Sequence, residues 1–180
     1  MQKKKPRPMR IIIEGLDRCG KSTLIQGLRA HYKYPFVCLH HGAPPFKDVQ
    51  MDIKYEIELY SNMFQIFNMF DYVIADRSHL GSLVYSPLYR GHDGTHVMTD
   101  ERLLPDDTIL ITLIDDPANL INRDDGLSFS TNTSSIETEV KLFIDAHNTS
   151  TIKNKLLFNI KMSTIIDVKT EVIAFINSKQ

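Results

Sequence analysis

Short runs of apolar residues alternate along the chain with longer segments in which apolar positions recur every three or four residues. Each short run is followed within three residues by a glycine or a charged residue, as expected of strands buried in a parallel sheet. Four such runs occupy residues 10–14, 37–39, 72–75 and 108–114, and we predict a fifth strand near 164–166.

The longer segments have helical spacing, seen best in the stripe Ile53, Ile57, Tyr60, Phe64 and Phe67. Strands that alternate with helices indicate a parallel sheet covered on both faces. The polar segment 124–135 is predicted to be a short lid. For 180 residues we expect one α/β domain, 1–180, with three layers and a parallel five-stranded sheet. Helices are predicted at 21–32, 49–68, 118–123, 136–157 and 169–176.

The amino-acid composition argues against several classes of function. The chain is 42% hydrophobic and 24% charged with a net charge of -1, unlike a generally basic coat protein of nucleic acids. Its two cysteines, Cys19 and Cys38, are too few and too scattered for a disulfide framework or a zinc site. No run approaches the roughly 18 apolar residues that span a bilayer, and the N-terminus lacks a signal-peptide pattern. We expect a cytoplasmic protein with no membrane partner.

Residues 15–22 read Gly-Leu-Asp-Arg-Cys-Gly-Lys-Ser and match G-x-x-x-x-G-K-[ST] at every fixed position, between a predicted strand and a predicted helix. In such a loop, backbone N–H groups and the positive end of the helix dipole face phosphate oxygens. Lys21 is expected at the β- and γ-phosphates of ATP, and Ser22 at Mg²⁺. The predicted ATP-binding residues of this segment are Gly15, Arg18, Cys19, Gly20, Lys21, Ser22 and Thr23.

Other P-loop classes fit less well. GTPases read guanine with N-K-x-D, whereas the Asn-Lys pair of this chain, Asn154-Lys155, is followed by two leucines. Large motor ATPases need a longer chain. A compact kinase that moves the γ-phosphoryl group of ATP to a nucleotide-like acceptor remains.

Residues 13–24 closely resemble the P-loop of thymidylate kinases, and Asp76-Arg77-Ser78 resembles their D-R-[YSH] motif and the E-R-S motif of deoxynucleoside kinases. Residues 116–118 with Arg123 are similar to the stretch before the lid, 143–157 to the helix after it, and 166–167 to the last strand. The resemblance implies a three-layer P-loop kinase fold, ATP with Mg²⁺ as donor and a possible homodimer. The short chain and lid would suit a phage enzyme.

The resemblance also assigns roles. The segment 124–135 holds no Lys or Arg, so the match is to thymidylate kinases whose catalytic arginine lies in the P-loop, here Arg18. Asp17 would accept a hydrogen bond from the 3′-hydroxyl of the acceptor, and Arg123 would lie over the ATP phosphates. Asp76 and Arg77 follow a strand, at the edge where α/β sheets place ligands.

Phosphoryl transfer depends mainly on positive charge around the migrating group. We therefore predict a catalytic set of Arg18, Lys21, Asp76 and Arg77, with Asp76 also near Mg²⁺ and Arg77 clamping an acceptor phosphate. Of the aromatic residues on the preceding helix, Phe64 is the candidate for contact with an acceptor base.

The acceptor stays open at this point. Thymidylate kinases carry an arginine on the helix before the D-R motif, but residues 49–71 contain none, and Arg90 in the turn-rich segment 86–94 is a candidate contact. His40 and His41 stand where deoxynucleoside kinases have a glutamate, and a histidine can accept a hydroxyl proton.

The leading hypothesis is a deoxynucleoside monophosphate kinase with a thymidylate-like acceptor. The alternatives are a kinase of hydroxyl groups, acting on a deoxynucleoside or on a hydroxymethylpyrimidine within DNA, and a non-catalytic nucleotide-binding switch. The intact P-loop residues speak against the switch.

Overall fold

The computed structural model describes residues 7–41, 53–123, 130, 132–161 and 163–180. Its sheet has five strands in the order β2-β3-β1-β4-β5, and every neighbouring pair is parallel. The predicted five-stranded parallel sheet is therefore confirmed. The strands are β1 (Met9–Gly15), β2 (Val37–His40), β3 (Tyr72–Asp76), β4 (Ile109–Ile114) and β5 (Asn154–Asn159).

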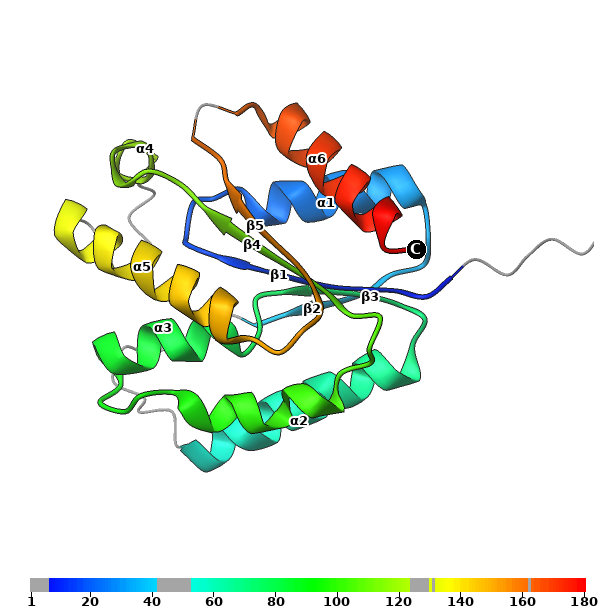
Figure 1. Ribbon diagram of the computed structural model, residues 1–180, viewed down its shortest axis with the longest axis horizontal. Helices are drawn as coiled ribbons and strands as arrows, with labels where there is room; N and C mark the ends of the chain where they lie inside the picture. Colours follow the sequence, from blue (N-terminus) through cyan, green and yellow to red (C-terminus); the bar gives the residue numbers. More distant parts are fainter. Residues whose placement is uncertain (1–6, 42–52, 124–129, 131, 162) are drawn as a thin grey trace, which may run out of the picture.

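Helices cover both faces of the sheet and give three layers (Figure 1). In this view α1 and α6 lie on one face, and α2, α3 and α5 lie on the other. The helices are α1 (Lys21–Tyr32), α2 (Ile53–Met69), α3 (Leu80–Tyr89), the 3₁₀ helix η1 (Thr95–Leu103), α4 (Pro117–Ile121), α5 (Thr133–Thr149) and α6 (Ile165–Ser178).

The central strands form the core, because they are apolar on both faces. Ile11, Ile12 and Ile13 of β1 are fully buried, and every residue of β4 is buried. The register pairs Ile13 with Asp76 of β3 and with Ile111 of β4. The carboxyl ends of the three strands consequently meet at one edge of the sheet, where the predicted site residues follow them.

Gly15 ends β1 with φ of 130°, and a Cβ atom there would lie 2.0 Å from the carbonyl oxygen of Leu113. Only glycine allows the chain to leave the sheet so close to β4. This contact fixes where the loop after β1 begins.

In the last third of the chain, the structure differs from two of the secondary-structure predictions. The strand predicted near 164–166 is wrong, since this segment begins α6, and the fifth strand is β5. Thr164 and Asp167 form a capping box, in which each side chain bonds the other residue's backbone N–H. This box starts a helix despite the two isoleucines between them. The helix predicted at 136–157 ends at Thr149 for the same reason that β5 exists: residues 154–159 pair with β4.

The segment after β3 also differs from expectation. The predicted loop at 86–94 is wrong in its first part, because α3 continues to Tyr89 with Pro87 near its end. Most of the predicted lid, residues 124–129 and 131, lies outside the described residues. Within the described ranges, the helices are too short or too polar for any of them to cross a membrane.

Candidate active site

The loop between β1 and α1 is closed by its own lysine. Lys21 is 6% exposed, and its Nζ donates hydrogen bonds to the carbonyl oxygens of Gly15 (2.9 Å) and Leu16 (2.6 Å). Burial lowers the pKa of the Lys21 ammonium. Arg18 and Gly20 both have positive φ, 66° and 74°, so the loop turns sharply around the lysine before the helix begins.

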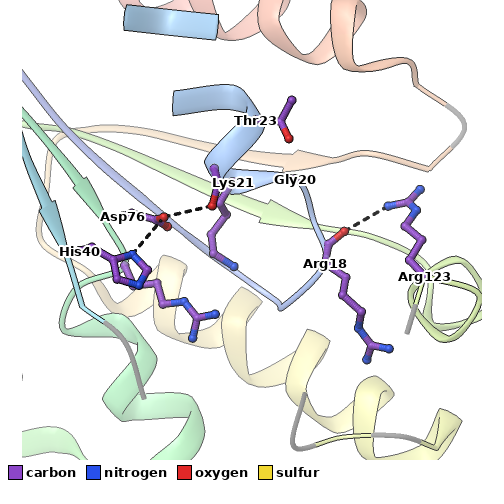
Figure 2. Close-up of a pocket in the computed structure, with 9 residues that line it drawn as sticks. Arg18, Gly20, Lys21, Thr23, His40, Asp76 and Arg123 are labelled. Carbon is purple, nitrogen blue, oxygen red and sulfur yellow. Dashed lines mark hydrogen bonds and ion pairs between the residues drawn. The ribbon is translucent and has the colours of Figure 1, made fainter. Parts of the chain in front are cut away.

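A pocket of about 390 Å³ opens beside this loop (Figure 2). Its cationic lining residues are Arg18, Lys21, Arg77 and Arg123, and Asp76 is the carboxylate among them. Such an excess of positive charge suits several phosphate groups held together. Gly20, Ser22, Thr23 and His40 complete the lining.

Asp76 at the end of β3 organises one wall of the pocket. Its Oδ2 lies 3.3 Å from Ser22 Oγ, which donates to it, and 3.2 Å from His40 Nδ1. Its Oδ1 is buried and has no hydrogen-bond partner among the described residues. A buried carboxylate oxygen beside a serine hydroxyl is the donor chemistry that Mg²⁺ prefers, so Ser22 and Asp76 fit the ion that the sequence implies.

Arg77 leaves the sheet with φ of 70° and joins β3 to the phosphate loop. Its guanidinium forms an ion pair with Asp17, and that carboxylate also lies 4.0 Å from Lys21 Nζ. The next residue, Ser78, donates its backbone N–H to the buried Glu14 carboxylate at 2.7 Å. Burial raises the pKa of Glu14 to about 7, although Ser78, Lys21 and Arg77 oppose the shift.

Arg18 and Arg123 approach the loop from different directions. The Arg18 side chain extends towards α5, and its guanidinium donates to the Ser130 carbonyl oxygen at 3.0 Å (Figure 2). Arg123 Nη1 forms an ion pair with Asp115 at 2.9 Å and lies 3.4 Å from the Arg18 carbonyl oxygen. Arg123 therefore reaches the pocket from the end of α4.

Cys19 and Thr23 contribute differently to the loop. Cys19 is 2% exposed, and burial raises the pKa of its thiol to about 12. Its contribution to an ATP site would therefore come from its backbone N–H. Thr23 is exposed at the start of α1 and lines the pocket.

The structure does not bring the two acceptor candidates Phe64 and Arg90 into this pocket lining. Phe64 is fully buried, with its ring edge-on to His79 at 5.0 Å between centroids. A ring buried in this way offers no face for a base to stack on. Arg90 forms an ion pair with Glu56 of α2.

Sequence reasoning missed Tyr85 and Glu14. The Tyr85 hydroxyl is buried with no hydrogen-bond partner among the described residues, and burial together with the Asp17 charge raises its pKa well above the usual value. It stands on α3, eight residues after Arg77 in the sequence. Recognising 80–89 as a helix would have placed Tyr85 beside the D-R motif.

Several solved structures share this architecture. The YorR protein from Bacillus subtilis, in complex with phosphorylated GDP, superposes with a TM-score of 0.72 at 18% identity over 94% of this chain and 96% of that one. Thymidylate kinase from Candida albicans superposes with a TM-score of 0.65 at 19% identity, over 96% of this chain and 92% of that one. Deoxyadenosine kinase from M. mycoides, with dCMP and dCDP bound as products, superposes with a TM-score of 0.60 at 20% identity, over 94% of this chain and 100% of that one.

Neither a family model nor a curated protein sequence matches the chain. At these identities the structural matches define the fold. The chain has the P-loop nucleotide-kinase fold, with a phosphate-binding loop between β1 and α1.

Proposed function

We propose that the protein transfers the γ-phosphoryl group of ATP to the phosphate of a deoxynucleoside monophosphate, with a thymidylate-like pyrimidine as first choice. The observation that carries this proposal is the cluster of Arg18, Lys21, Arg77 and Arg123 around one pocket. A donor triphosphate and an acceptor phosphate together need that much positive charge, whereas a neutral hydroxyl needs less.

In this proposal each of the four cationic side chains has a separate role. Lys21 exchanges the loop carbonyls that it now bonds for the β- and γ-phosphate oxygens of ATP. Arg18, whose guanidinium lies towards α5, stabilises the charge that develops on the migrating group. Arg123 holds the outer side of the donor phosphates. Mg²⁺, held by Ser22 and Asp76, would neutralise phosphate charge when bound.

Arg77 and Asp17 form the acceptor side in this proposal. The guanidinium has further N–H groups besides the one that bonds Asp17, so it can clamp an acceptor phosphate while the pair persists. Asp17 and Tyr85 would then face the sugar of the acceptor. Thymidylate kinase and deoxyadenosine kinase both occur among the similar structures, so the acceptor class follows from the charge of the pocket and not from the fold.

The test is the acceptor Michaelis constant of Arg77→Ala. Removal of a charged, hydrogen-bonded contact should raise it by roughly 30-fold or more, with the Michaelis constant for ATP little changed. Arg77→Lys, which keeps the charge and loses the planar fork, should recover part of the loss. Arg29→Ala, in the exposed last turn of α1, is the matched control. An unchanged acceptor constant in Arg77→Ala would remove the phosphate from this position.

One observation favours a second candidate, a kinase of hydroxyl groups. His40 Nδ1 lies 3.2 Å from Asp76 Oδ2, so the carboxylate can orient the imidazole as a general base. The neighbouring His41 is a poorer candidate, because burial and then Arg90 lower its pKa to about 4. If the acceptor is a hydroxyl group, His40→Ala should lower turnover at least about a hundredfold. If it is a monophosphate, turnover should change much less.

A further inference from the structure

A second polar cluster lies where α2 meets the residues that lead from the end of α3 into the first turn of η1. Glu56 of α2, His92 and His96 each offer one ligand atom, and these atoms all lie within 4.8 Å of one another. Glu56 is fully buried, and the His96 side chain is 15% exposed. Oxygen and imidazole nitrogen atoms that converge at this spacing can share one small ion.

The turn that carries the two histidines is held in place. Gly94 has φ of 73°, and a Cβ atom there would lie 2.2 Å from the carbonyl oxygen of Ser82 on α3. Asp93 Oδ1 accepts hydrogen bonds from the backbone N–H and the hydroxyl of Thr95, both at 2.9 Å. His92 and His96 therefore have a fixed separation, which reduces the ordering that an ion would require.

The hydrogen bonds of the cluster leave one imidazole unsatisfied. One oxygen of Glu56 accepts from Arg90, and the other lies 2.9 Å from His96 Nε2. Both ring nitrogens of His92 are buried with no hydrogen-bond partner among the described residues, although the His92 and His96 ring centroids are 5.2 Å apart. A buried polar atom without a partner is unfavourable, because it has given up its hydrogen bonds to water.

We propose that Glu56, His92 and His96 bind one divalent transition-metal ion of the zinc class. Two imidazoles and a carboxylate suit such ions better than Mg²⁺ or Ca²⁺, which prefer all-oxygen sites. The ion would replace the His96–Glu56 hydrogen bond and give a buried nitrogen of His92 its partner. Arg90 would stay on the other carboxylate oxygen and orient it, as outer partners of metal ligands do. A bound ion would thus connect α2 to the chain after α3.

The test uses tag-free protein carrying Cys38→Ser, which removes the exposed thiol as a competing ligand. Co²⁺ is the probe, read by its visible d–d absorption during titration and by metal analysis after dialysis. We expect one Co²⁺ per chain, displaced by Zn²⁺ and not by excess Mg²⁺. His92→Ala should weaken binding at least about tenfold, because it removes one ligand. His31→Ala, at an exposed position on α1, should not weaken it.

His92 is the decisive position, because its ring makes no hydrogen bond among the described residues that the folded protein would lose. A rise in the unfolding temperature on Co²⁺ addition, absent in His92→Ala, would be the second readout. If the Cys38→Ser protein takes up no Co²⁺, or His92→Ala and His31→Ala bind it equally well, the metal site does not exist.

Discussion

Arg77 donates a hydrogen bond to the Asp17 carboxylate, and this ion pair joins the end of β3 to the phosphate loop that follows β1. The same carboxylate lies 4.0 Å from Lys21 Nζ. One side chain therefore connects the proposed donor and acceptor sides of the site. Because the two sides share this carboxylate, the kinetic constants for ATP and for the acceptor have to be measured separately for each variant.

Lys21→Ala should reduce turnover at least about a hundredfold, because the charge at the β- and γ-phosphates is lost. The fold should remain, since the buried ammonium serves the loop carbonyls and not the core. Turnover and the circular dichroism spectrum of the purified variant provide the measurement. A folded Lys21→Ala protein with near wild-type turnover would rule out the loop as a catalytic site.

Arg18→Ala should lower kcat far more than it raises the Michaelis constant for ATP, because its contact strengthens as charge develops during transfer. The Ser130 carbonyl loses its donor as well, but that contact lies away from the pocket lining. Steady-state kinetics with varied ATP separate the two constants. A change confined to the Michaelis constant would make Arg18 a binding residue only.

The sequence predicted those parts of the fold in which local pattern and tertiary structure agree. The buried isoleucines of β1 and the loop that follows them show this, because apolar runs and glycine positions are local signals. The segment 154–159 is different, since the pattern of Asn-Lys-Leu-Leu-Phe-Asn is compatible with a helix until it pairs with β4. Thr164 and Asp167 did carry a local signal, a capping box, and the isoleucines between them obscured it.

Of the site residues, those that belong to short sequence motifs could be predicted. Lys21, Ser22, Asp76 and Arg77 belong to two short motifs, and the sheet brings these together. Partners supplied by tertiary packing, such as Glu56 for Arg90, had no sequence signal, because Glu56 lies on α2 and Arg90 follows the end of α3.

Glu14→Gln should stabilise the protein more at pH 8 than at pH 4.5. The pKa of Glu14 in the folded protein, about 7, exceeds its usual 4.5, so the folded state binds the proton more tightly than the unfolded chain. Wild-type stability from this group therefore falls as pH rises from 4.5 to 7, by at most about 3 kcal/mol. Glutamine cannot ionise and still accepts from Ser78. Urea unfolding of both proteins across this range is the measurement.

Glu137→Gln, at an exposed position on α5, controls for the loss of one charge. Equal stability gains for Glu14→Gln at pH 4.5 and pH 8 would show that Glu14 does not ionise at an elevated pKa.

Glu101→Gln should destabilise the protein by about 3 kcal/mol at pH 7, because a buried partner of His79 loses its charge. Burial opposes ionisation of Glu101, but hydrogen bonds from His79, Thr151 and Ser150 hold its pKa at about 2. This stabilisation is fully present above pH 4.5 and is lost as pH falls towards 2. Urea unfolding at pH 7 and pH 3 should therefore show a smaller difference at pH 3. A variant as stable as wild type at pH 7 would contradict this role.

The central claim, that the acceptor is a deoxynucleoside monophosphate, is tested most directly by finding which acceptor receives the phosphoryl group. The measurement offers radiolabelled ATP with thymidine, the four deoxynucleoside monophosphates, or DNA containing hydroxymethylpyrimidine, under identical conditions and with Lys21→Ala as the inactive control. The proposed function predicts label on a monophosphate, thymidylate first, with thymidine and DNA unlabelled. Label on the DNA or on thymidine, with every monophosphate untouched, would contradict it and establish the hydroxyl kinase in its place.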